Sequence, residues 1–317
     1  MVFLSQRKQV ALELEATEGT AETIIAADLI HPAFDVEYTP TFEFADRNVV
    51  QDSFSRIASV PGERSAQITF SVELKGSGTA GTAPSQLAKP LQACAFGETI
   101  VASTSVTYAP VSESIKSATV EMREVDDDGT AKIFQLVGAR GTVVFTAVKG
   151  QPVMATFTFT GRYIEPTEGS MLTTPAPTPN PIPFLNASVS FQAVGTLKVQ
   201  NVEIDMANTV ALRNDANQVS GNFSALITGR VPTGTLDPEM EENATFNPWK
   251  KLTDGDEGVL SYALTGSAGN ITTVNAPKVQ LTNVEQGDRD AITITPLSFV
   301  LNQSVDIGDD EISIAFT

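Results

Sequence analysis

The sequence predicts a mainly β protein in which two similar β-sandwich or β-barrel domains follow one another, each flanked by one short α-helix. The main observation is a plan that occurs twice: strand, long polar loop, strand, turn of small residues, helix. The second is a series of short alternating apolar runs between glycine turns, which is typical of half-buried strands. The expected parts are an N-terminal arm over residues 1–34, a first β domain over 35–164, a proline-rich linker over 165–184 and a second β domain over 185–317.

Segments of the two halves match in chain order at shifts of 153 to 160 residues, which suggests a duplicated domain. The matched pairs are Glu43 with Glu203, Leu74 with Ile227, Pro84 with Pro238, Val120 with Val279, and Phe157 with Ile314. Because the shift falls from 160 to 153 across the long loop, the loop of the first copy is expected to be about seven residues longer. The alternative is two unrelated β domains that look alike because strand patterns are repetitive.

The elements of the first domain follow from the alternation of its apolar residues. The arm before it is polar and rich in Glu, Thr and Ala, so we expect it to order only against a neighbour, with weak alternation that allows one strand. After the turn 77–83, Leu87, Leu91 and Cys94 share one face of a helix. Strands are predicted at 67–74, 104–108, 118–125, 132–137, 142–147 and 154–160.

The linker and the second domain repeat this logic. Residues 173–183 are rich in proline, so this segment is expected to be stiff and to span roughly 30 Å. The second helix is expected to begin with Asp237 as its N-cap and Pro238 at its first position. Its apolar face would consist of Phe246, Trp249 and Leu252, and strands are predicted at 259–265, 278–284, 291–300 and 311–316.

The long polar loop of each copy is the feature that most suggests a function. A loop of this length inside a compact domain is usually functional, and exposed apolar residues need a surface to cover them. The first loop spans Arg47–Arg64 and its expected counterpart spans Thr209–Gly221. A hairpin that packs on its own domain is the alternative. The residues expected to contact another copy are Val49, Val50, Phe54, Ile57, Arg213 and Asn214.

The composition narrows the function classes. The net charge is −18 and the pI about 4.4, so the surface is expected to repel nucleic acid. The sequence has no apolar run near the length of a membrane span, and its first residues lack the order of a signal peptide. Cys94 is the one cysteine, which excludes internal disulfides, and it is expected to be buried.

No catalytic, cofactor or metal site is expected. The clusters Asp126–Asp128 and Asp254–Glu257 lack the spacing of a calcium loop, and we expect them to be solvated turns. The glycine-rich turns lack the Gly-Lys-Ser/Thr end of a phosphate loop. His31, the one histidine, is expected to be structural. A pair of carboxylates could serve a glycosidase, but the sequence singles out none.

Several segments resemble one family of virion proteins. Residues 73–84, followed by Leu91-x-x-Cys94-x-Phe96, are similar to the strand-to-helix segment of major tail tube proteins of long-tailed bacteriophages. Residues 138–145 and 156–161 resemble the rest of that domain, and residues 229–239 and 280–290 resemble a second tube-type domain. These matches touch most of residues 35–317, and their joint order carries the resemblance because none is a catalytic signature.

The resemblance implies two tandem tail-tube-type domains in a structural virion protein that is not an enzyme and needs no cofactor. Sheets of neighbouring subunits would join into a continuous barrel. Single-domain relatives form hexameric rings, so three two-domain chains are expected to form one pseudo-sixfold ring. Stacked rings would form the tail tube, with the long loops in contact between rings. The implied partners are other copies, the tape measure protein, the tail-end and terminator proteins, and double-stranded DNA that passes through without specific binding; assembly would take place in the cytoplasm of the host bacterium, without a membrane.

Two other classes stay open on the sequence. A secreted or surface-attached β-sandwich adhesion protein fits the strands and the linker, although the sequence shows neither signal nor anchor. A carbohydrate-active enzyme fits the acidic residues but lacks a defined site. Filaments in negative-stain micrographs of the purified protein would separate the tube class from both.

Overall fold

The computed structural model describes residues 2–173, 178–195 and 197–317, and over these residues the chain is mainly β, as predicted. The first half contains β1 (Phe3–Leu14), η1 (Ala26–Asp28), β2 (Leu29–Ile30), β3 (Phe34–Ala45), β4 (Val60–Glu73), α1 (Ala88–Ala93), β5 (Phe96–Val101), β6 (Ser105–Pro110), β7 (Ala118–Asp126), β8 (Ala131–Val148), β9 (Met154–Tyr163) and β10 (Thr167–Gly169). The second half contains β11 (Ser190–Phe191), β12 (Asn201–Asp205), β13 (Asn208–Asn214), β14 (Asn222–Arg230), β15 (Thr233–Leu236), α2 (Pro248–Asp254), β16 (Glu257–Leu264), β17 (Thr272–Val284), β18 (Gly287–Arg289), β19 (Ile292–Ile294), β20 (Leu297–Leu301) and β21 (Ser313–Phe316).

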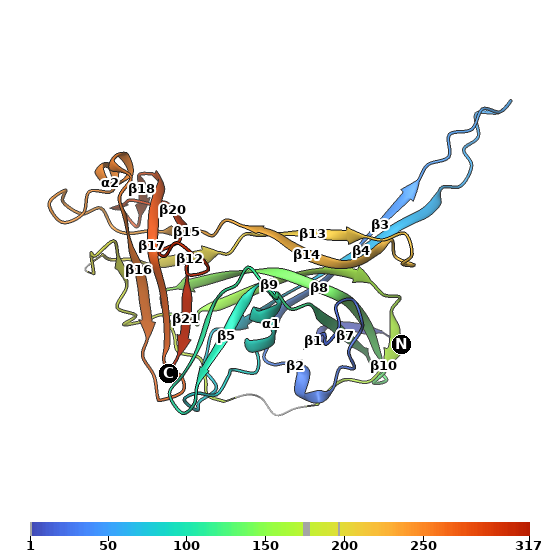
Figure 1. Ribbon diagram of the computed structural model, residues 1–317, viewed down its shortest axis with the longest axis horizontal. Helices are drawn as coiled ribbons and strands as arrows, with labels where there is room; N and C mark the ends of the chain where they lie inside the picture. Colours follow the sequence, from blue (N-terminus) through green and yellow to red (C-terminus); the bar gives the residue numbers. More distant parts are fainter. Residues whose placement is uncertain (1, 174–177, 196) are drawn as a thin grey trace.

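One continuous sheet runs through both halves (Figure 1). Its antiparallel strands follow the order β3, β4, β9, β8, β12, β15, β20, β17. The halves join where β8 pairs with β12 and Phe145 lies opposite Ile204, both fully buried. The joint between the two halves is therefore made of backbone hydrogen bonds over a shared core.

The two long hairpins have the same strand register, which is strong evidence of duplication. The first is β3–β4, and the second is formed by β12 and β13 against β14 and β15. Corresponding pairs are Glu37–Thr69 and Glu203–Thr235, Phe42–Arg64 and Asn208–Arg230, and Phe44–Pro61 and Val210–Ile227. Every residue is offset by 166, and both ladders shift register at the corresponding position. The two hairpins therefore have the same total length, but the pairing extends farther in the second, so the loop outside the strands is seven residues longer in the first (46–59 against 215–221), as expected.

The remaining strands of the repeat correspond at a different offset. β7, β8 and β9 match β16, β17 and β20 at an offset of 140, so Val120–Leu136 corresponds to Leu260–Ala276. β1 pairs with β7 as β11 pairs with β16. The sequence matches of Val120 with Val279 and of Phe157 with Ile314 were therefore wrong. The matches of Glu43 with Glu203 and of Leu74 with Ile227 were wrong as well, because the offset of 166 pairs Glu203 with Glu37 and Ile227 with Pro61. Alternating apolar residues recur in every strand, so such matches do not determine which strand corresponds to which.

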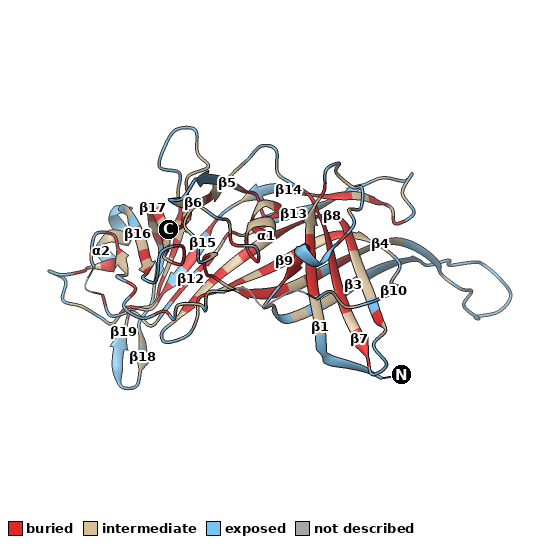
Figure 2. Cartoon of the chain, turned by 90° about the horizontal axis from the view of Figure 1, so that it is seen from below, coloured by how far each residue is buried: buried red, intermediate tan, exposed pale blue. Residues whose placement is uncertain are grey.

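The core lies on one face of this sheet, against α1 (Figure 2). Leu87, Leu91 and Cys94 are fully buried, as the helix pattern predicted. They belong to the same buried cluster as Phe70 of β4 and Phe157 of β9, whose rings lie 5.6 Å apart. β5 and β6 follow α1 without a counterpart in the second half, and β6 pairs with the C-terminal strand β21. This pairing adds a second joint between the halves.

The predicted arm over residues 1–34 does not stand apart from the body over its described residues, 2–34. β1 pairs with β7 from Lys8 to Leu14, and Val10 and Leu12 are fully buried. Of the predicted linker, residues 167–169 form β10 against β8, and Phe184 packs on Tyr262. The proline-rich residues 174–177 lie outside the described residues.

The second helix begins later than predicted. Pro248 occupies its first turn, and the side chain of Asn247 caps it by accepting a hydrogen bond from the Lys250 backbone N–H. Asp237 instead accepts from the Gln200 and Asn201 N–H groups and pairs with Arg289. Within the described part of the chain, no helix is long and apolar enough to span a bilayer.

Candidate assembly interface

The second hairpin lies across the first half of the same chain, along β8 and β9 (Figure 1). Its backbone comes so close to Gly138 that an added Cβ there would lie 2.8 Å from the Ser224 Cβ. The buried Arg140 guanidinium donates to the carbonyl of Ala225. The Asn208 amide donates to the carbonyls of Gly141 and Cys94, at 3.0 Å each. Polar groups of the two segments thus pair across this contact, while Arg140 Nε and Asn208 Oδ1 are buried without a hydrogen-bond partner among the described residues.

Two glutamates in the loop after β1 hold this contact together. Glu15, which is 7% exposed, accepts hydrogen bonds from the Gly19 and Gly138 N–H groups and from the hydroxyls of Ser117 and Thr119. Glu18 accepts from the Ser224 hydroxyl at 2.5 Å and from Arg140 at 3.3 Å. Burial alone would raise the pKa of Glu18, but these hydrogen bonds hold it below its ordinary value.

The turn of the second hairpin rests against two arginines at the base of the first. The Arg64 N–H donates to the Ser220 carbonyl at 2.9 Å, and its guanidinium reaches the Val219 carbonyl at 3.3 Å. The Arg162 guanidinium donates to the side-chain oxygen of Gln218 at 2.8 Å. A pocket of about 290 Å³ remains between the turn and these arginines. The turn therefore has a defined seat on the first half of the chain.

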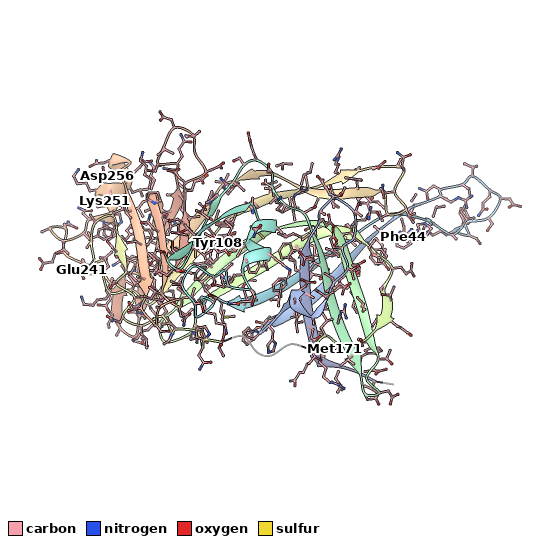
Figure 3. The ribbon with its side chains drawn as sticks, turned by 60° about the horizontal axis from the view of Figure 1, so that its bottom comes forward. Phe44, Tyr108, Met171, Glu241, Lys251 and Asp256 are labelled. Carbon is pink, nitrogen blue, oxygen red and sulfur yellow. The ribbon has the colours of Figure 1, made fainter. Side chains whose placement is uncertain are left out.

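The first hairpin, in contrast, projects away from the body of the molecule (Figures 1 and 3). Its last aromatic contact with the body joins Phe42 and Tyr163, whose rings lie 5.1 Å apart, and Phe44, farther out, is exposed. At the tip, Val50 and Phe54 are 105% and 112% exposed. Such apolar exposure on a projecting element marks an interaction site.

The structure separates the predicted contact residues into two groups. Val49, Val50, Phe54 and Ile57 lie together in the loop between β3 and β4. Arg213 and Asn214 lie on β13, which the sequence placed in a loop; only residues 215–221 form the turn. Arg213 stacks over the Phe223 ring at 5.0 Å in its own chain. The sequence analysis missed Arg64, Arg162 and Glu18, because only the folded chain brings them to the second hairpin.

The corresponding base of the second hairpin opens onto a pocket of about 350 Å³ next to β21. Arg230, the counterpart of Arg64, lies there 2.9 Å from an Asp309 oxygen and 3.0 Å from a Glu311 oxygen. Burial opposes a low pKa for Asp309, but hydrogen bonds from Ser112 and Arg230 keep it lowered. The apolar part of the lining includes Ile227 and Ile307, and Ile307 is 93% exposed.

The face of the sheet opposite the core is polar in both halves. In the first half it carries threonines and serines, with the Thr69 and Thr158 hydroxyls 3.3 Å apart. In the second half a shallow hollow of about 240 Å³ is lined by Glu203, Asp205 and Thr235. Glu37, offset from Glu203 by 166 residues, is exposed on this face of β3. Carboxylates thus recur at corresponding positions of the two halves.

The acidic clusters take part in turns and ion pairs. The carboxylates of Asp126–Asp128 lie within 4.8 Å of one another, and Asp126 accepts from the N–H groups of Asp128 and Thr130. In the second cluster Asp256 lies 3.8 Å from Lys251, where the last turn of α2 ends (Figure 3). Burial of Cys94 raises its thiol pKa well above the ordinary value, which fits the predicted buried cysteine. His31 is exposed.

The comparisons with known proteins agree with this architecture. A family model described as phage tail tube protein matches residues 5–313, which is nearly the whole chain. No curated protein matches the sequence.

Proposed function

The chain belongs to the phage tail tube protein family, and from this premise we propose that three copies close into one ring and that stacked rings form the tube that delivers DNA. It is a structural protein of the virion tail. The rest of the proposal concerns how its two halves build that tube.

The observation that carries the proposal is the pair of open edges at the ends of the continuous sheet. Over the described residues, no strand pairs with the edge of β3 that faces away from β4. At the other end of the sheet, β16 pairs with β17 only as far as Gln280, and among the described residues no strand pairs with the same edge of β17 and β18 after Gln280. Open edges of this kind invite pairing with another chain, and ring closure removes them. The pairing of β8 with β12 inside the chain is the pattern for the proposed contact between copies. In this pairing Thr146 of β8 lies opposite Glu203 of β12.

The offsets between the two halves predict which residues would form the same pairing between neighbouring copies. A register shift between Leu281 and Asn283 raises the offset between β8 and its counterpart to 141 beyond that point. Thr146 pairs with Met154 as Gly287 pairs with Ile294, so Gly287 is the counterpart of Thr146. Since Glu37 is the counterpart of Glu203, Gly287 of one copy is expected to lie opposite Glu37 of the next. The six units expected from the family resemblance then come from three chains. The two halves differ in sequence, so the ring would show threefold and not sixfold symmetry.

The polar face of the sheet is the proposed wall of the bore. It carries hydroxyl groups, the corresponding carboxylates Glu37 and Glu203, and Asp205 of the second half. Such a wall repels the DNA phosphates at short range, within about 8 Å at physiological salt. DNA would then pass without specific binding.

The remaining partners are proposed on the family resemblance. The tape measure protein would occupy the bore during assembly, and terminator proteins would close the tube ends. Assembly would take place in the host cytoplasm. Val49, Val50, Ile57, Arg213 and Asn214 stay predicted contacts between stacked rings. Replacing residues 46–59 by a tight turn is expected to leave a folded chain that no longer forms tubes.

Image reconstruction of tubes grown from the purified protein tests the ring. We expect three chains in each ring, with the two halves of a chain side by side around the circumference. Six chains in a ring, or the two halves of one chain stacked along the axis, would refute the arrangement.

A further inference from the structure

We infer that the pocket at Arg230 receives the loop tip Asp52–Phe54 of the neighbouring chain in the same ring. The inference rests on the proposed ring. It assigns to Phe54 a partner within the ring in place of the stacked ring predicted from the sequence. Its basis is the strand register that the two hairpins share. Because this register assigns each residue of one hairpin a counterpart in the other, the observed contact of the second hairpin turn predicts a corresponding contact of the first hairpin loop.

The observed contact is the seat of the second hairpin turn on the first half. There Gln218, Val219 and Ser220 bind Arg64 and Arg162 through the hydrogen bonds described above. The Asn222 amide adds a hydrogen bond to the Arg64 carbonyl at 3.3 Å. The turn thus fills a site whose walls are the start of β4 and the end of β9.

Each part of this seat has a counterpart in the second half. The offset of 166 relates Arg64 to Arg230, and the offset of 140 relates Arg162 and Tyr163 to Asn302 and Gln303. Arg230 and Gln303 both line the open pocket of about 350 Å³. This pocket is therefore the corresponding seat, without a hairpin turn from its own chain in it.

The same offset identifies the segment that would fill the pocket. Gln218, Val219 and Ser220 correspond to Asp52, Ser53 and Phe54, at the tip of the projecting hairpin. In Figure 1 this tip and β21, beside the pocket, lie at opposite ends of the molecule, so a second copy has to supply it.

The chemistry of the tip suits this pocket. Phe54 and Ile307 are both almost fully exposed in the single chain, and contact between them would remove both side chains from water. Arg230 pairs with both Asp309 and Glu311, so these three side chains carry one net negative charge, and Asp52 of the loop has to bind on the Gln303 side of the pocket. The side-chain amide of Gln303, which lines the pocket, is positioned to donate to Asp52, as Arg162 donates to Gln218.

Substitution of the apolar pair tests the contact. Phe54→Ser and Ile307→Ser are each expected to abolish rings in sedimentation velocity and negative stain, while the melting temperature of the chain stays unchanged. Leu185→Ser is the control: Leu185 is also an exposed apolar residue, at 52%, but it lies in neither the loop tip nor the pocket. Rings that form normally with Phe54→Ser, or single rings that form but no longer stack, would overturn the inference.

Cross-linking tests the partner directly. A variant with both Phe54→Cys and Ile307→Cys, treated in assembled form with a short bis-maleimide, is expected to give covalent species of up to three chains. The single-cysteine variants are the controls, and the buried Cys94 contributes little background. A ladder beyond three chains, or rings without cross-links, contradicts the inference. A wild-type protein that forms no rings would count against the proposed function, and with it against this contact.

Discussion

Glu15 shows how much a single side chain contributes to the packing of the first half, beneath the second hairpin. Its carboxylate accepts from β8 through Gly138 and from the start of β7 through Ser117 and Thr119. Glu15→Ala would leave these donors buried without an acceptor, and we expect it to lower the free energy of unfolding by about 3 kcal/mol in chemical denaturation. Glu113→Ala, at an exposed position, is the control and is expected to stay within about 0.5 kcal/mol of wild type.

Glu18 makes the seat of the second hairpin sensitive to acid. Its pKa is lowered in the folded chain, so its stabilising effect is fully present above the unfolded value of 4.5 and is lost as the pH falls through the folded pKa. We expect hydrogen exchange in β14 to accelerate below about pH 4.5 in the wild type. In Glu18→Gln it should already be faster at pH 7 and change less with acid. Equal pH profiles for the two proteins would exclude this role of Glu18.

At the scale of elements, the close approach of β14 to β8 depends on the absence of a side chain at Gly138. This residue has φ +63°, and an added Cβ would meet Ser224. We expect Gly138→Ala to cost about 2 kcal/mol and to loosen β14, measured by denaturation and hydrogen exchange. Gly150 has φ +81° and open space around it, so Gly150→Ala carries only the backbone strain, about 1 kcal/mol. If the two variants behave alike, the hairpin contact contributes little.

The sequence determined most strands and the buried face of the first helix, because alternation and helical spacing are local properties. β4, β7 and β9 and the face of Leu87 and Leu91 were found this way. The helix start at Asp237 was wrong for a long-range reason. Arg289 and the N–H groups of Gln200 and Asn201 engage its carboxylate, and Glu239 joins β19 as an extended residue.

The candidate interface was only partly predictable. The exposed apolar loop tip was visible in Val50 and Phe54, since such residues stand out in a polar segment. The seat was not, because Arg64 and Arg162 become neighbours of Gln218 only through pairing between distant strands. The register itself depends on which strand is the partner, and that information is not contained in a strand's own pattern.

At the scale of the whole molecule, the charge on the polar face should govern passage through the bore. Glu37→Lys with Glu203→Lys would change corresponding positions in both halves from repulsive to attractive for phosphate. We expect virions carrying both substitutions to form normal tails but to eject DNA severalfold more slowly in a fluorescence assay. Glu113→Lys adds an exposed positive charge outside this face and is the control. Unchanged ejection, or a cryo-EM map with a positive wild-type bore, would contradict the assignment of this face.

The joint between β8 and β12 also has a kinetic consequence. Both strands belong to one chain, so they meet at an effective concentration that the connecting segment sets, on the order of millimolar for a short flexible tether. This contact forms as the chain folds and does not weaken when the solution is diluted. A ring of three chains would therefore need only two encounters between molecules and one closing contact to join six units, and dilution would break it at those three contacts into intact chains.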